Sequence, residues 1–292
     1  MKLKDYVTLG NLLAGFASVI ALFYGSFDWA CYLIYIAYIF DILDGPVARL
    51  THQHDEFGGI LDTVCDYITN SIAASFIIVF AFWQRAHYPL WIAALIGAFP
   101  FTFGTIRQAK GMEKPISYPC YWLGVPRPVS AMFILAMLNS SLFSMGGPLQ
   151  PYMHALAAIL VIVLSVLHLS KIPFVSHHER RWMSGLRFGA WFFLAGSPIS
   201  FFVGWLVLDW PGLGYDYLFF SFLAYVLISW TQIPKTDLRR IKQVLAGGPL
   251  VLPLVHREST DGWRSCTGGD YFIVKDIPDS VEGERLTRDD EA

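Results

Sequence analysis

Long apolar stretches recur along this chain of 292 residues and restrict its fold more than any other feature. A helix needs about 20 predominantly apolar residues to cross the hydrocarbon core of a bilayer. Stretches of about that length are separated here by short polar or Pro/Gly-containing breaks. The sequence therefore predicts an all-α fold, a polytopic transmembrane helix bundle of about eight helices. Their approximate ranges are 7–25, 28–48, 57–83, 87–106, 127–146, 152–172, 187–208 and 214–233.

Composition agrees with a protein whose solvent is the bilayer. Hydrophobic residues make up 55% of the chain and charged residues 15%, which lies outside the usual range of soluble domains. The formal net charge of −2 does not attract a polyanion such as nucleic acid. We therefore expect the lipid bilayer, and no nucleic acid, as a partner. The four cysteines form no C-x-x-C pair, and we expect neither a disulfide framework nor a zinc site.

Basic residues predict the orientation in the membrane, because short loops rich in Lys and Arg stay in the cytoplasm. The loops on the opposite side offer only Arg85. We therefore expect both termini to be cytoplasmic. The residues on the basic side are Lys2, Lys4, Arg49, Arg107, Lys110, Lys114, Arg127, Lys171, Arg180, Arg181 and Arg187.

The chain divides into two parts by composition. Residues 1–234 hold the apolar stretches and form the predicted transmembrane domain. Residues 235–292 are charged and Gly/Pro-punctuated, and we expect a soluble cytoplasmic tail that is partly disordered. Within it, residues 236–245 form either a short amphipathic helix on the membrane surface or a solvated basic flank.

Four aspartates lie in or beside the predicted spans. Placing an ionisable side chain within a bilayer costs free energy, so such residues are candidates for a functional role. Asp41 and Asp44 are three apart, and Asp62 and Asp66 are four apart, so each pair shares a helix face. A short polar loop joins the two helices, which should make them antiparallel neighbours and let the pairs meet. Such a carboxylate cluster needs cations, and all-oxygen ligands suit Mg²⁺, Mn²⁺ or Ca²⁺. The sequence thus predicts a divalent-metal site of the kind used at pyrophosphates.

These aspartates belong to a longer pattern. Residues 41–49, eight further residues and then residues 58–66 match, without a gap, the signature D-x-x-D-G-x-x-A-R-x8-G-x-x-x-D-x-x-x-D. The chain is thereby identified, by resemblance, as a member of the CDP-alcohol phosphatidyltransferase family. The resemblance implies an enzyme of phospholipid biosynthesis that moves a phosphatidyl group from CDP-diacylglycerol to a small alcohol and releases CMP. It also implies a homodimer.

The resemblance assigns roles to single residues. It implies a pair of Mg²⁺ or Mn²⁺ ions, with Asp66 acting also as the general base, whether transfer is direct or passes through a phosphatidyl-enzyme. Arg49 offers hydrogen-bond donors that match the geometry of a phosphate. Alternatively, it is a basic residue that only helps to keep its loop on the cytoplasmic side of the membrane. The implied metal ligands are Asp41, Asp44, Asp62 and Asp66. The implied lining of the CDP site is Gly45, Ala48, Arg49 and Gly58.

Three further segments, residues 8–15, 123–128 and 164–174, resemble a group within the family, the membrane-spanning bacterial phosphatidylserine synthases. This likeness favours serine as the acceptor and the bacterial inner membrane as the location, with the active site facing the cytoplasm. Gly111-Met112 stands where that group has Phe-Asn. Candidate ligands for the acceptor's carboxylate or the donor's phosphate, which could also be positive-inside residues, are Arg107, Lys110 and Arg127.

Other functions remain open on the sequence. Choline, inositol or glycerol phosphate could replace serine. Phosphorylated acceptors would need a denser basic pocket, and choline an aromatic cage, for which Tyr118, Tyr121 and Trp122 are available unless they belong to an interfacial belt. A cation transporter would hold its aspartates near the bilayer midplane. A catalytically inactive scaffold is disfavoured because the whole signature is intact.

Overall fold

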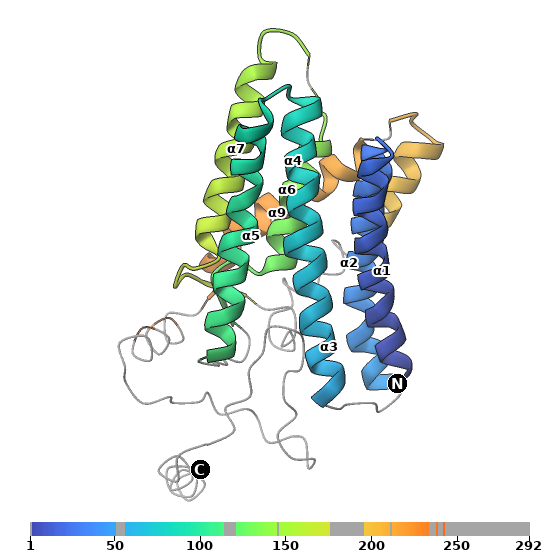
Figure 1. Cartoon of the computed structure of the whole chain (residues 1–292), viewed down its shortest axis with the longest axis vertical. Helices are drawn as coiled ribbons and strands as arrows, with labels where there is room; N and C mark the ends of the chain where they lie inside the picture. The colour runs from blue at the N-terminus through green and yellow to red at the C-terminus, as the bar shows by residue number, and fades with distance from the viewer. Residues whose placement is uncertain are drawn as a thin grey trace, which may run out of the picture.

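The computed structural model describes residues 2–50, 56–113, 121–144, 146–175, 196–210 and 212–233, with Leu238 and Lys242. This part of the chain is mostly helical, as predicted (Figure 1). The α-helices are α1 Leu3–Phe23, α2 Phe27–Leu50, α3 Glu56–Tyr67, α4 Ala74–Phe80, α5 Leu90–Glu113, α6 Arg127–Asn139, α7 Gln150–Leu167, a short helix Gly196–Leu206 and α9 Leu213–Ile228. Two π-helical segments are η1 Ile68–Ala73 and η2 Ala81–Arg85, and Ser229–Gln232 is a 3₁₀ turn, η3.

Five helical segments are long and apolar enough to cross a membrane. They are Leu3–Phe23, Phe57–Arg85, Leu90–Lys110, Gln150–Leu167 and Leu213–Thr231. Two further apolar helices, α6 and Gly196–Leu206, are shorter. The 24-residue α2 has the length to span but carries three aspartates.

Two predicted spans have wrong boundaries. The stretch 127–146 holds only the 13 residues of α6, because the helix ends at Asn139. The side chains of Asn139 and Ser140 donate to the carbonyls of Leu135 and Met137, and such local bonds compete with helical ones. The stretch 87–106 continues to Glu113, since Arg, Gln, Ala and Lys at positions 107–110 are good helix formers.

Some predicted features lie outside the described residues. They include the tail 235–292 with its 236–245 segment, apart from Leu238 and Lys242. They also include residues 187–195 of the seventh predicted span. Cys31 and Cys65 are buried free thiols, while Cys120 and Cys266 lie outside the described part.

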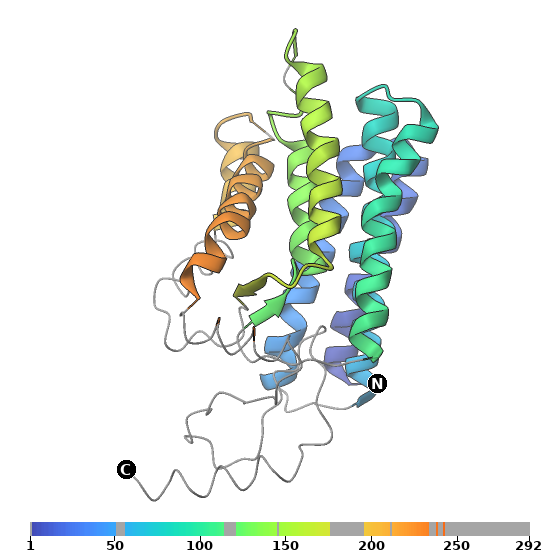
Figure 2. The same cartoon turned by 90° about the vertical axis from the view of Figure 1, so that its left-hand side faces the viewer.

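One small sheet departs from the all-α prediction. Strand β1, Tyr121–Leu123, pairs antiparallel with β2, Pro173–Val175, so that Leu123 lies opposite Pro173. Gly124, Pro126 and Pro173 interrupt helix formation around these short extended segments. Figure 2 shows the two strands in the half of the bundle that holds the N-terminus.

Helix packing sets the centre of the molecule. The side chains of Ser130–Leu138 in α6 are all buried, and α6 packs against α9, α7 and α4. In Figure 2, α9 and the short helix Gly196–Leu206 lie on one side of α6 and α7, and α5 lies on the other. Helix α2 contacts α9 and the short helix directly, because Tyr32 packs against Tyr215 and the Tyr35 hydroxyl bonds to Ser197. Helix α1 packs along α2 and also touches α3 and η1. It therefore joins the two helices that carry the aspartates.

Candidate active site

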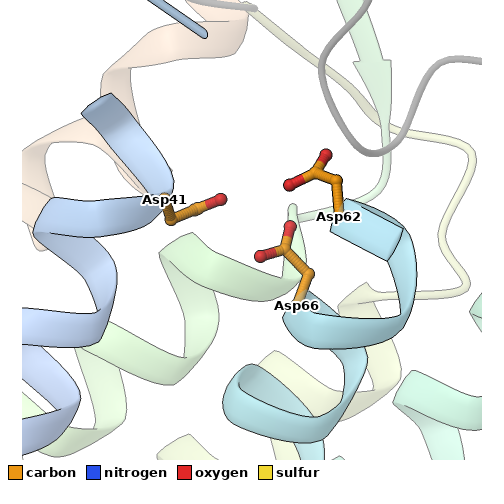
Figure 3. Close-up of side chains that lie close together, drawn as sticks. All are labelled: Asp41, Asp62 and Asp66. Atoms are coloured by element: carbon orange, nitrogen blue, oxygen red, sulfur yellow. The ribbon is translucent and has the colours of Figure 1, made fainter. Parts of the chain in front are cut away.

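Three of the four predicted aspartates meet in one cluster (Figure 3). Asp41 comes from α2, and Asp62 and Asp66 from successive turns of α3. One carboxylate oxygen from each lies within 4.8 Å of the others. Asp66 is buried and the other two are half-buried. Carboxylates this close repel one another strongly away from water, so the all-oxygen donor set fits Mg²⁺ or Mn²⁺.

The cluster lies along α2 and α3 rather than at their ends. Asp62 is six residues from the start of α3, which corresponds to about 9 Å along the helix. Asp41 is nine residues before the end of α2, or about 13 Å.

The remaining signature residues have different placements. Asp44 is outside the cluster of three and accepts a long hydrogen bond of 3.4 Å from the Thr8 hydroxyl. Gly58 is buried in the first turn of α3. Gly45, Ala48 and Arg49 belong to the last turns of α2, but their burial and contacts fall outside the described part of the structure. Their roles at a CDP site stay predictions.

Sequence reasoning missed Asn11, which contacts the cluster directly. Its Nδ2 donates to Oδ1 of Asp66 at 2.9 Å, and both side chains are buried. The signal for it was present in α1, where polar residues recur at helical spacing on the buried side. That buried side comprises Asp5, Thr8, Asn11, Ala14, Gly15, Ser18 and Leu22.

Arg127, a predicted anion ligand, is buried at the first position of α6, with 2% of its surface exposed. Its charge interacts attractively with Asp66. A guanidinium is always charged and matches carboxylate and phosphate geometry. The structure thus places one buried cation within electrostatic range of Asp66.

Arg107 and Lys110, the other two candidates, lie near the end of α5. Nη1 of Arg107 donates to the backbone carbonyls of Leu123, at 2.7 Å, and His168, at 2.8 Å. Lys110 is exposed. Of the aromatic residues considered for a choline cage, Tyr121 and Trp122 belong to β1, and Tyr118 lies outside the described residues.

A buried hydrogen-bonded junction holds the start of α6 against the end of α7. His168, which sequence reasoning also missed, bonds through Nδ1 to the carbonyl of Val125 at 3.1 Å and through Nε2 to the Ser130 hydroxyl at 2.9 Å. A carbonyl only accepts, so Nδ1 carries a proton. The backbone N–H of Gly124 donates to Ile172. These bonds join two segments that are far apart in sequence, 123–128 and 164–174, into one structural unit that includes Arg127.

Comparison with known proteins identifies several relatives of this chain. The chain is 28% identical over 173 residues to CDP-diacylglycerol–serine O-phosphatidyltransferase of Helicobacter pylori, covering 57% of this chain and 70% of the relative. It is 31% identical over 179 residues to archaetidylserine synthase of Methanothermobacter thermautotrophicus, covering 59% and 69%. It is 27% identical over 167 residues to phosphatidylinositol phosphate synthase of Mycobacteroides abscessus, covering 56% and 75%.

The sequence profile of one family, CDP-alcohol phosphatidyltransferase, matches residues 1–167, which is more than half of the chain. This region contains all four signature aspartates, Asn11 and Arg127. Together with the five apolar helices, the match describes an integral membrane enzyme of phospholipid biosynthesis. The chain belongs to the CDP-alcohol phosphatidyltransferase family.

Proposed function

We propose that this enzyme transfers a phosphatidyl group from CDP-diacylglycerol to serine, releases CMP and depends on a divalent cation. The observation that carries the proposal is the cluster of Asp41, Asp62 and Asp66, together with buried Arg127, whose charge interacts attractively with Asp66. Two relatives are named CDP-diacylglycerol–serine O-phosphatidyltransferase and archaetidylserine synthase, and both names support serine as the acceptor.

The chemistry divides between the cation and the side chains. When bound, Mg²⁺ or Mn²⁺, in our proposal two ions, stabilises charge on the pyrophosphate oxygens. The proposed ligands are Asp41, Asp44, Asp62 and Asp66, and Gly45, Ala48, Arg49 and Gly58 are proposed to line the CDP site.

In a direct displacement, Asp66 accepts the proton of the serine hydroxyl. The hydroxyl oxygen then forms a bond to the phosphorus that bears diacylglycerol. The bond from that phosphorus to the oxygen of the CMP phosphate breaks, and CMP leaves with the bonding electrons. Arg49 is proposed to stabilise the charge of the departing CMP.

Among the basic candidates, Arg127 has the strongest support as the ligand of the acceptor carboxylate. It is buried and interacts with Asp66. Nη1 of Arg107 already donates to two carbonyls. Lys110 is exposed one turn further along α5 and would meet an anion on its way to the site.

We further propose eight spans, cytoplasmic termini and an active site facing the cytoplasm of a bacterial cell, in its inner membrane. The end of the bundle nearer the aspartates also holds Lys2, Lys4 and Lys110. Arg85 lies at the end of η2, where the chain turns toward α5 at the opposite end. This distribution follows the rule that basic residues stay in the cytoplasm.

The proposal is tested with purified protein in lipid nanodiscs, labelled CDP-diacylglycerol, Mn²⁺ and a panel of acceptors. Serine should yield a phosphatidyl product, while choline, inositol, inositol phosphate and glycerol 3-phosphate should not. One buried guanidinium suits one carboxylate better than a phosphate dianion. Asp66→Asn is the inactive control. Product from another acceptor, with none from serine, would reject serine and leave the family assignment intact.

A further inference from the structure

The hydrogen bond between Asn11 and Asp66 is a direct side-chain contact from α1 to the carboxylate cluster. Asn11 has 1% of its surface exposed and Asp66 5%. The 2.9 Å bond runs from an amide Nδ2, which only donates, to a carboxylate Oδ1, which only accepts when ionised. The contact therefore restrains the rotation of the Asp66 carboxylate.

Close helix packing fixes this contact. One turn beyond Asn11, a Cβ added at Gly15 would lie 2.6 Å from Oγ1 of Thr69. Thr69 belongs to η1, the π-helical segment that begins two residues after Asp66. Such π segments occur often at functional sites, and this one packs directly against α1. The backbone approach at Gly15 thus holds the amide of Asn11 against Asp66.

The second polar atom of Asn11 argues against a purely structural role. Its Oδ1 is buried and has no hydrogen-bond partner among the residues that the structure describes. A buried amide with an unused oxygen lowers stability, whereas a leucine of similar size would bury no polar atom. Stability alone would not favour asparagine at this position.

We propose that Asn11 is a positioning residue for the transfer reaction. Its amide holds the Asp66 carboxylate in one orientation, so that the other oxygen keeps its place toward Asp41 and Asp62. This inference rests on the proposed function, which gives Asp66 its role as base and metal ligand. Partners that orient a metal ligand typically change activity or metal affinity by about 10- to 100-fold when they are removed.

The test compares Asn11→Leu and Asn11→Asp, which both remove the amide donor, with Asn11→Gln, which keeps it. Ser18→Ala is the matched control, because Ser18 is equally buried on the same face but bonds only to its own helix, at Gly15. Three readouts are needed: steady-state kinetics with the acceptor that the panel identifies, Mn²⁺ binding followed by EPR without lipid substrate, and the melting temperature in detergent.

We expect Asn11→Leu and Asn11→Asp to lower kcat by about 10- to 100-fold and to weaken Mn²⁺ binding on the same order. The KM for the acceptor should change less than about threefold, since Asn11 does not contact the acceptor in this proposal. Asn11→Leu should change the melting temperature little, because loss of the donor to Asp66 opposes removal of the unused amide oxygen. Asn11→Gln should recover part of the lost kcat, and Ser18→Ala should retain full kcat.

Two results would overturn the inference. One is a kcat within about threefold of the parent in both donor-free variants. The other is loss of activity that follows a lowered melting temperature in every variant, Ser18→Ala included, which would indicate packing alone. If Asp66→Asn is inactive while the Asn11 variants are normal, only this inference fails. If Asp66→Asn is itself fully active, the proposed role of Asp66 fails, and with it the premise of this inference. The proposed function fails only if the parent protein forms no phosphatidyl product from serine.

Discussion

Gly124→Ala should disrupt the junction that holds Arg127 beside the carboxylates. Gly124 has a φ of +74°, a conformation that costs a residue with a Cβ about 1–2 kcal/mol. The new Cβ would also lie 2.6 Å from the carbonyl oxygen of His168 and 2.8 Å from that of Leu167. Both atoms are backbone and cannot rotate away, so the strands or α7 must shift. Overpacking of this kind costs about 1–3 kcal/mol more.

Gly25→Ala is the matched control. Gly25 has nearly the same φ, +72°, but nothing lies within 4 Å of an added Cβ. It should therefore lose only the conformational part, and the difference between the two variants isolates the steric part, about 1–3 kcal/mol. At about 2–4 °C for each kcal/mol, Gly124→Ala should melt roughly 2–12 °C below Gly25→Ala.

The assay is thermal unfolding in nanodiscs at one fixed scan rate, because membrane proteins of this kind can unfold irreversibly. Transfer activity is measured on the same samples at a temperature where both variants remain folded. We expect Gly124→Ala to have the lower kcat, because Arg127 follows three residues later. Equal melting temperatures for the two variants would refute the reasoning, since they would show that the junction accommodates a methyl group without strain.

Three other predictions concern the site itself. Excess chelator should abolish CMP release, because carboxylates within 4.8 Å of one another cannot organise a pyrophosphate unaided, and full release under chelation would exclude a metal site. Asp66→Asn should reduce transfer by about 10²- to 10⁴-fold while CDP-diacylglycerol binding, measured by equilibrium dialysis, persists; near-normal turnover would remove Asp66 from the role of base. Arg107→Ala should lower both kcat and melting temperature, because it removes two bonds to backbone carbonyls, whereas Lys110→Ala should only raise the KM for serine. A raised KM with unchanged melting in Arg107→Ala would instead indicate an acceptor ligand.

The aspartates could be predicted because their signal is local. Asp62 and Asp66 are one turn apart on one helix, and an intramembrane carboxylate is costly enough to stand out in a single sequence. Their meeting with Asp41 followed from a short connection between two spans. The role of α1 did not follow, because Asn11 and its partner Asp66 are 55 residues apart. No periodicity within α1 identifies that partner.

The junction at Arg127 could not be predicted from the sequence for a different reason. Strands β1 and β2 have three residues each, too few for an alternating pattern to be recognised. In the sequence, His168 is a single polar residue at the end of an apolar stretch, which indicates no partner. Its bonds to Val125 and Ser130 are visible only in the folded structure. The likeness of segments 123–128 and 164–174 to the serine enzymes pointed to both parts of the junction but not to their contact.

The polar face of α1 also bears on how the protein enters the membrane. Alone in a bilayer, α1 would present Asp5, Thr8, Asn11 and Ser18 to lipid, where polar groups are poorly tolerated. Helix α2 follows after a tight turn and covers α1 along its length, but the partner of Asn11 arrives only with α3. When only the first two helices of a nascent chain have entered the bilayer, Asn11 would therefore still be exposed to lipid. Stable integration of α1 should be completed only when the third helix leaves the translocon, so that membrane insertion and assembly of the carboxylate cluster become a single event.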